Sequence, residues 1–296
     1  MEALSNKMRI VMDSAGDMPA GWAQEFEVEI IPINIQFGEQ TFLSGIDLSN
    51  KDFYRLADES GVIPKTSQPT PQQFIQFYEK VAKAGETIIS VHVTGKLSGT
   101  LDSARIAARE LAGKYNVIPL DSASGSAAMG YMAREARLME RAGATVEQIV
   151  QRLEQISRNV QIILTLNTLE YARRSGRVKA LQAALASLLN VKPVIILKEG
   201  VLELGDRVRT RSRALEFVVE TICQRLGQQL VNVAVVHAED PQAAETLLQS
   251  AQSRLNCNDL IVTDLSIGIA ANLGPGTAGI IAYPVEEIRD EKNGKL

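Results

Sequence analysis

Two segments rich in hydroxyl side chains are the parts of this sequence best suited to bind a ligand. They are Thr66-Ser67-Gln68-Pro69-Thr70-Pro71 and, further along the chain, Gly95-Lys96-Leu97-Ser98-Gly99-Thr100. We expect Thr70 to cap a helix that Pro71 opens, with Gln73 completing a capping box, and the second segment to lead from a strand into a helix. Helix starts carry unpaired backbone N–H groups at the positive end of the helix dipole. The two segments therefore predict a site for a carboxylate or phosphate that needs no catalytic residue.

Ser98 is the residue of these segments that could act as a nucleophile, but its surroundings disfavour that chemistry. The run Gly95-Lys96-Leu97-Ser98-Gly99 lacks the spacing of a G-x-S-x-G nucleophile elbow. The histidines are His92 and His237, and neither shows an obvious acidic partner that would make it a base. We interpret both as structural residues, His92 inside a strand and His237 at the end of one. A serine hydrolase is therefore disfavoured.

Strand and helix patterns alternate along the chain, which is typical of an α/β protein with a largely parallel sheet. Strands are predicted over 8–12, 86–93, 117–121, 160–165, 231–236 and 260–265, with hairpins over 30–43 and 194–204. Helices are predicted over 72–84, 101–111, 124–141, 146–156, 213–226 and 241–255, with helical pieces around 169–189. Asp240 is expected to cap the last of these helices, and a glycine-rich segment follows before residues 280–282.

A division into two units is expected near Arg158. The sequence predicts an N-terminal α/β domain over 1–158, a second α/β domain over 159–290 and a tail over 291–296. Both hydroxyl segments belong to the first domain, and the glycine-rich loop belongs to the second. A ligand shared by these loops would lie in the crevice between the domains, where such sites are common.

The predicted helix 124–141 contains many small or flexible residues. Met129, Met132, Ala133 and Ala136 lie along it at positions that would allow another element to approach its backbone closely. Two interpretations stay open. The helix either packs tightly on the sheet or forms a wall of a narrow apolar channel, in which the flexible methionine side chains would adapt to a ligand.

Composition excludes several functional classes. The chain has 296 residues, enough for two domains, and its formal net charge is −4 with Lys and Arg scattered, which disfavours a nucleic-acid surface. Aromatic residues make up 5%, so few platforms exist for stacking bases. No apolar run reaches bilayer length and the start lacks the pattern of a signal peptide, so we expect a cytoplasmic protein. Cys223 and Cys257 lie too far apart in sequence for a zinc motif.

The order of the motifs resembles the DegV family, bacterial proteins that bind fatty acids and present them to a fatty acid kinase. The resemblance covers almost the whole chain. It rests on Ile10-Val11-Met12-Asp13-Ser14-Ala15-Gly16-Asp17, the two hydroxyl segments, Asp121-Ser122, Ser175-Gly176-Arg177-Val178, Arg209-Thr210-Arg211 and Gly274-Pro275-Gly276-Thr277-Ala278-Gly279. It implies a two-domain fold with a Rossmann-like parallel-sheet domain that binds the fatty acid, a C-terminal α/β domain, a lipid tunnel and a head-group site near the interface.

The resemblance also implies roles for particular residues. In DegV proteins the hydroxyls that match Thr66 and Ser98 hydrogen-bond the carboxylate of the fatty acid, together with a histidine that opens a His-x-Gly-Pro-Gly motif. This sequence has Asn272 at the histidine position. An Asn amide donates a hydrogen bond but does not titrate, so we expect a weaker head-group contact there. Gly99 and Gly274 complete the predicted carboxylate-binding set.

Arg177 is predicted to act in transfer more than in binding. The arginine of the matching Gly-Arg motif is tied to kinase-dependent transfer in the family, and this chain has Ser175-Gly176 in place of the usual Gly-Gly. A guanidinium binds carboxylate or phosphate in a planar, bidentate manner. The alternative is a solvated basic helix start in which the Arg side chain braces a neighbouring carbonyl.

Together these patterns predict a carrier without catalytic residues, metal or cofactor. It would bind one long-chain fatty acid in an apolar tunnel, lined by candidates on helix 124–141, and present the carboxylate to an ATP-dependent kinase that makes acyl-phosphate for phospholipid synthesis. Contact with a membrane surface is expected during lipid exchange. The alternatives are an enzyme of phosphoryl or acyl transfer that uses the loops to hold an anion, and an interaction module that needs no lipid.

Overall fold

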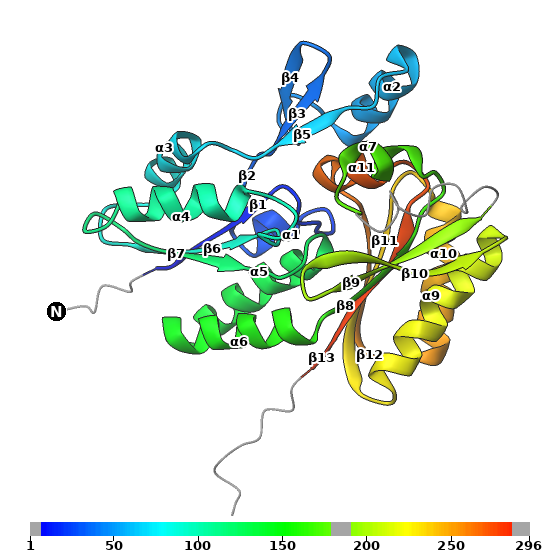
Figure 1. Cartoon of the computed structure of the whole chain (residues 1–296). Helices are drawn as coiled ribbons and strands as arrows, with labels where there is room; N and C mark the ends of the chain where they lie inside the picture. Colours follow the sequence, from blue (N-terminus) through cyan, green and yellow to red (C-terminus); the bar gives the residue numbers. More distant parts are fainter. Residues whose placement is uncertain (1–6, 179–190, 286–296) are drawn as a thin grey trace, which may run out of the picture.

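The computed structural model describes residues 7–178 and 191–285. Its strands form sheets of four, six and three strands. Figure 1 shows the two larger sheets side by side, each with its own helices, and the three-stranded sheet projecting from the N-terminal unit. The α/β class predicted from the sequence is confirmed. The predicted tail 291–296 lies outside the described residues.

The four-stranded sheet is parallel throughout, in the order β2-β1-β6-β7. Its strands are β1 (Arg9–Asp13), β2 (Val28–Ile31), β6 (Thr87–His92) and β7 (Asn116–Asp121). Side chains of β6 alternate between two clusters. Ile88 packs with residues of α3 (Pro71–Val81) and α4 (Thr100–Glu110), whereas Ile89 packs with residues of α5 (Ala127–Arg141). Helices therefore cover both faces (Figure 1), as a parallel sheet requires.

The hairpin predicted over 30–43 is confirmed from residue 34 onward, but residues 30 and 31 belong to the parallel sheet. The chain leaves the parallel sheet after β2 and then forms β3 (Asn34–Phe37), which pairs with β4 (Gln40–Leu43) and with β5 (Lys65–Ser67) in the small antiparallel sheet. Pro32 lies between β2 and β3; because it has no backbone N–H, strand pairing breaks there and the chain changes sheet. Thr66 and Ser67, at the start of the first hydroxyl segment, are part of β5.

The six-stranded sheet has the order β10-β9-β8-β13-β11-β12. Its strands are β8 (Gln161–Thr165), β9 (Lys192–Lys198), β10 (Val201–Val208), β11 (Leu230–His237), β12 (Asn256–Asp264) and β13 (Ala278–Pro284). Of its pairings, β11 with β12 is parallel and the others are antiparallel. The prediction of a largely parallel sheet therefore holds for the N-terminal unit and is wrong for this one.

The remaining described helices are α1 (Trp22–Glu25), α2 (Asn50–Ser60), α6 (Val146–Asn159), α7 (Glu170–Ser175), α9 (Arg211–Leu226), α10 (Pro241–Arg254) and α11 (Ile267–Leu273). The predicted capping box of Thr70 and Gln73 is confirmed, as is the Asp240 cap, whose carboxylate accepts from the N–H of Ala243. Helix α3 ends three residues before the predicted end at 84 and α5 begins three residues after the predicted start at 124. Of the predicted pieces around 169–189, α7 is observed and 179–189 lie outside the described residues.

Helix α11 occupies the first part of the segment that the sequence describes only as glycine-rich, and the Gly-Pro-Gly loop at 274–276 follows it as a turn. Gly268 lies inside it, and a Cβ there would come within 3.2 Å of the Ser14 carbonyl oxygen and 3.3 Å of Ile33 Cδ1. The glycine thus serves a close approach between α11 and the N-terminal unit. It lowers the helix propensity of the segment, which explains why the helix was not predicted.

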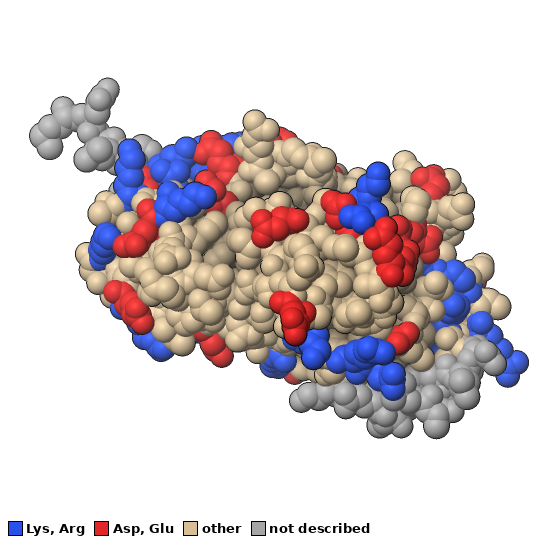
Figure 2. Space-filling model, turned by 90° about the horizontal axis from the view of Figure 1, so that it is seen from above, with Lys and Arg blue, Asp and Glu red and all other residues tan. Residues whose placement is uncertain are grey.

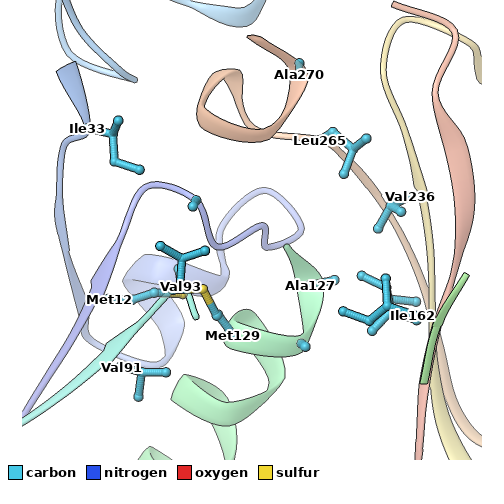
Figure 3. Packing of buried hydrophobic residues seen from close by; sticks show 14 of the residues in the cluster. Met12, Ile33, Val91, Val93, Ala127, Met129, Ile162, Val236, Leu265 and Ala270 are labelled. Carbon is cyan, nitrogen blue, oxygen red and sulfur yellow. The ribbon is translucent and has the colours of Figure 1, made fainter. Parts of the chain in front are cut away.

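One apolar cluster extends across both units. Figure 3 shows Met12, Val93 and Met129 on the side of the parallel sheet and Ile162 and Val236 on the six-stranded sheet, with α5 between them. A hydrogen bond adds to this contact, since the Tyr131 hydroxyl of α5 donates to the Val233 carbonyl at 2.8 Å. The units therefore share a core through α5, and a boundary near Arg158 stays a proposal.

The upper end of the molecule carries β3, β4, β5, α2, α7 and α11 (Figure 1). Seen from above, its broad middle is covered mainly by uncharged residues, with isolated acidic side chains, and Lys and Arg side chains do not merge into one patch (Figure 2). Within the described ranges, no helix combines the length and the apolar character needed to cross a bilayer.

Candidate ligand-binding site

A cavity of about 80 Å³ lies where loops of the N-terminal unit meet α11 and the β9–β10 hairpin. It brings together Thr66, Ser98, Asn272 and Arg177, which are far apart in the sequence. The other lining residues are Ala15, Ile33, Ser67, Gln68, Val93, Leu97, Leu202, Gly268, Ile269 and Leu273. Polar groups therefore converge on a mostly apolar space, which is the usual character of a small-ligand site.

Thr66 and Asn272 are in direct contact. β5 pairs with β3, which fixes Thr66 opposite Ile35, and α11 presents Asn272 from the other unit. The Asn272 side-chain amide donates to Thr66 Oγ1 at 3.4 Å and to the Gly268 carbonyl at 2.7 Å. Two of the predicted head-group contacts thus lie at one point of the cavity wall, and Asn272 is held there by its own helix.

Ser98 lies at the turn before α4. Its Oγ shares a hydrogen bond of 2.9 Å with Thr100 Oγ1 and accepts from the Thr100 N–H at 3.3 Å. The N-cap residue Gly99 has no side chain to cap α4. When Thr100 donates the shared bond, the hydroxyl hydrogen of Ser98 is available to an anion in the cavity.

Neither Gly99 nor Gly274 is among the residues that line the cavity. A Cβ on Gly99 would lie 2.7 Å from Gln68 Nε2, so this glycine allows the two hydroxyl segments to pack together. Gly274 ends α11 with a φ of 87°, and a Cβ there would lie 2.9 Å from Tyr171 Cδ2 of α7. Both glycines therefore position the cavity walls. Gln68 does line the cavity, although its place in the motif gave no reason to select it.

Arg177 is the positively charged side chain that lines the cavity. It follows Gly176, which ends α7 with a φ of 70°, and its Nη1 donates to the Ser175 carbonyl at 2.8 Å. Burial lowers the pKa of this half-buried guanidinium. No carboxylate of the described residues forms an ion pair with it. A desolvated cation without a counter-charge favours an anion beside it. Arg177 also lines, with Lys96, an adjoining open recess of about 420 Å³.

The acyl-channel candidates lie in the core instead of at the cavity. Met129, Met132, Ala133 and Ala136 are at most 1% exposed and line none of the recesses described for this part of the chain. Helix α5 is packed closely, since a Cβ on Gly130 would lie 2.1 Å from the Asp17 carbonyl oxygen. The cavity is also small, because about 150 Å³ is the size that holds benzene. It has room for a head group and the first carbons, and a longer chain requires side chains to move.

A second polar cluster lies nearby and is completely buried. Asp13 Oδ2 is 3.1 Å from His92 Nδ1, His92 Nε2 is 2.8 Å from Ser90 Oγ, and the Tyr78 hydroxyl donates to Ser90 at 2.9 Å. The expectation that no histidine has an acidic partner is therefore wrong for His92, and it is also wrong for His237, whose Nδ1 lies 3.5 Å from Asp264 Oδ1. All four side chains of the cluster are 0% exposed and line none of the described recesses, which agrees with the interpretation of His92 as a structural residue.

Comparison with known proteins gives concordant matches. The family model described as "Uncharacterised protein, DegV family COG1307" matches residues 7–285. A DegV domain-containing protein of Deinococcus radiodurans is 31% identical over 280 residues, 93% of this chain and 98% of its own length. A DegV family protein from Thermus thermophilus, whose structure is described as fatty acid binding, is 30% identical with a TM-score of 0.86, covering 94% of this chain and 100% of that one. DegV of Bacillus subtilis, described as a fatty acid-binding protein, is 26% identical with a TM-score of 0.82, over 94% and 99%.

Proposed function

This chain belongs to the DegV family, and we propose that it binds one long-chain fatty acid and presents the carboxylate to a separate ATP-dependent kinase. The observation that carries the proposal is the convergence of neutral polar side chains, Thr66, Ser98 and Asn272 among them, and one guanidinium without a carboxylate partner in the described residues on a single small cavity. The fatty acid binding described for the relatives from Thermus thermophilus and Bacillus subtilis supports it. The kinase, the acyl-phosphate product and membrane contact during exchange are the further parts of the proposal.

The carboxylate is placed by hydrogen bonds. Thr66 and Ser98 would donate from the N-terminal unit, while Arg177 supplies the positive charge. Asn272 would donate from α11 by exchanging its longer bond, 3.4 Å to Thr66 Oγ1, for one to the carboxylate. Hydrogen bonds to a charged group contribute about 1.5–3 kcal/mol each. The sequence assigned Arg177 to the encounter with a kinase; its position in the same cavity supports a direct contact with the carboxylate as well. Because Asn272 cannot ionise, the guanidinium is the source of charge complementarity in this site.

The hydrocarbon chain supplies most of the affinity. For a 16-carbon acid, burying about 14 methylenes at ~0.8 kcal/mol each offers roughly 11 kcal/mol before association costs of several kcal/mol. Ile33 and Val93 line the cavity and also belong to the core cluster that contains Met12 and Met129 (Figure 3). The tail would enter past these two residues and displace flexible methionine side chains beside α5.

No observation favours the alternative of an acyl- or phosphoryl-transfer enzyme. The buried cluster of Asp13, His92 and Ser90 has the residue types of an acid–base system, but its side chains face the core and hydrogen-bond one another. A general base must come within hydrogen-bond reach of its substrate. The polar groups at the cavity serve binding instead, so the protein is proposed to be a carrier without catalytic residues.

Extraction of the purified protein tests the proposal. Native mass spectrometry should show one bound fatty acid, and the delipidated protein should take one up from solution. Mixed with the cognate kinase and ATP, the loaded protein should yield acyl-phosphate. Absence of a fatty acid together with failure to take one up would refute the carrier function. Uptake without phosphorylation would leave a fatty acid-binding protein with a different consumer.

A further inference from the structure

A groove of about 700 Å³ lies between the two units, apart from the ligand cavity. Its walls come from the loop after β1 and α1, the end of β2, the loop between β4 and α2, and the segment from the end of β12 to the start of α11. None of the predicted site residues lines it. The groove is therefore a surface feature that fatty acid binding does not explain.

The rim of this groove is unusually apolar for a surface. Seven large hydrophobic residues of the described chain are exposed, and three of them line the groove: Ile46 at 67%, Ile30 at 38% and Val262 at 38%. Single exposed hydrophobic residues are ordinary, but exposed hydrophobic residues gathered in one hollow mark an interaction site. The gathering of these three side chains thus points to a partner.

The charge of the groove has one sign. Its lining includes the carboxylates of Asp17 and Asp264 and no Lys or Arg. Asp264 is 66% exposed at the rim, 3.5 Å from His237 Nδ1. Asp17 lies deeper, where it accepts from the Ser126 hydroxyl and the Ser266 N–H and has no cationic partner in the part of the chain that the structure describes.

The neighbourhood of the groove is also acidic. Burial, followed by the charges of Glu239, Asp264 and Asp17, raises the pKa of the neighbouring Tyr54 hydroxyl. Asp17 and Asp264, two of the carboxylates that act on Tyr54, also line the groove. A positively charged group is the complement that such a surface selects.

We propose that the groove binds a segment of a partner protein in which one Arg or Lys is flanked by apolar side chains. The flanking side chains would cover Ile30, Ile46 and Val262, and the cation would meet Asp264 at the rim. A protein segment fits better than a small amine, because Ile46 projects from an open hollow and a small molecule would leave it exposed. Aromatic side chains and Arg are the residues that most often anchor the centre of such interfaces.

The position of the groove gives a partner access to the ligand site. Ser266 and Ile267, at the start of α11, line the groove, whereas Gly268 and Asn272, further along the same helix, line the cavity. A docked segment would thus contact the helix that holds Asn272. The chemistry of the groove does not depend on which ligand occupies the cavity, so this inference and the proposed function are tested separately.

Selection from a random 12-residue peptide library on the full-length, ligand-loaded protein tests the inference. Enriched peptides should carry an Arg or Lys between apolar residues, and their affinity should fall at least tenfold for Ile46→Asp and for Asp264→Lys. Leu138→Asp on α5 and Asp102→Lys on α4 are matched exposed controls outside the groove and should bind within twofold of the unsubstituted protein. Thermal unfolding shows that each variant is folded.

Charge exchange gives the sharpest readout. A selected peptide whose basic residue is changed to Glu should lose binding to the unsubstituted protein and regain it on Asp264→Lys. The inference is overturned if selection enriches nothing, if the enriched peptides lack a basic residue, or if the groove variants bind like the control variants. A small amine that co-purifies in the groove and blocks the peptides would also overturn it.

Discussion

The molecule contains two polar clusters, one buried around His92 and one lining the ligand cavity. The buried cluster has the residue types of an acid–base system, yet the cavity is the candidate site. The Asp13–His92–Ser90–Tyr78 cluster contains an acid, a base and two hydroxyls, but it is sealed and its groups bond one another. The cavity holds simple donors and Arg177, whose charge lacks a partner among the described residues. Unmet hydrogen-bonding capacity beside an open space, more than the residue types, marks a binding site.

Removing the Asp13 carboxylate should have the largest effect, and it should act on stability. Asp13 accepts from the N–H groups of Ala15 and Val93, each at 2.9 Å, and contacts His92. Removing one partner of a buried charged pair costs about 3–5 kcal/mol. Asp13→Ala should therefore lower the free energy of unfolding, measured in urea, by that amount. Asp13→Asn, which keeps one acceptor, is the milder control. Unchanged stability in Asp13→Ala would show that the cluster is not structural.

Asp17→Asn should raise stability at alkaline pH. Burial raises the pKa of Asp17 to about 6, against hydrogen bonds from Ser126 and Ser266 that lower it and the charge of Asp264 that raises it further. The folded state therefore binds the proton more tightly than the unfolded chain. The resulting stability is present below about pH 4 and is lost as pH rises through about 6.

The raised pKa of Asp17 corresponds to a loss of roughly 2–3 kcal/mol in the free energy of unfolding between acidic pH and pH 8. Asp17→Asn should recover part of that amount at pH 8, where the unsubstituted protein holds a buried charge, and should gain little at pH 4. Denaturant unfolding across this pH range measures the difference. A variant that is less stable than the unsubstituted protein at pH 8 would mean that the Asp17 charge holds the two units together.

Arg177→Ala tests the polar residues of the cavity, as Asp13→Ala tests the buried cluster. We expect the affinity for a fatty acid to fall by about 1.5–3 kcal/mol, the value of a bond to a charged group, while the free energy of unfolding changes by about 0.5 kcal/mol or less. Arg173→Ala, an exposed neighbour on α7 that does not line the cavity, is the control. Normal affinity with lost acyl-phosphate formation would instead support the role in transfer alone.

Asn272→His should produce the smallest change. An imidazole at this position adds positive charge below its ordinary pKa of about 6.5, so binding of a carboxylate should strengthen a few-fold, about 1 kcal/mol or less, at mildly acidic pH. Isothermal titration at pH 5.5 and pH 8 measures the change. Equal affinity at both values would place residue 272 outside the head-group contact.

Local signals in the sequence predicted what depends on neighbouring residues. The caps at Thr70 and Asp240 follow from side chains that bond backbone groups three residues away, so they were predicted correctly. The break between β2 and β3 at Pro32 depends on which sheet each strand joins. The position of α11 depends on a close contact with Ser14 in the other unit. Such features rest on tertiary packing, which periodicity does not specify.

The residues of the candidate site also fall into two groups, those that the sequence indicated and those that only the fold brings to the cavity. The hydroxyls of Thr66 and Ser98 stood out because their segments lead into predicted helix starts, although Thr66 itself lies in β5, and Asn272 stood out through the family motif. The sequence also singled out Arg177, but only the fold places its side chain at the same cavity as the hydroxyls. Gln68 and Leu202 carried no signal, because their place at the cavity follows from how the two units meet.

The most direct test of the central claim compares the affinities of palmitate and methyl palmitate for the delipidated protein. The two ligands bury the same hydrocarbon chain and differ at the charged head group that Thr66, Ser98, Asn272 and Arg177 are proposed to bind. The acid should bind at least about tenfold more tightly, a difference of about 1.4 kcal/mol or more, and Arg177→Ala should reduce that ratio. Equal affinity for the acid and the ester would contradict the assignment of this cavity as the carboxylate site.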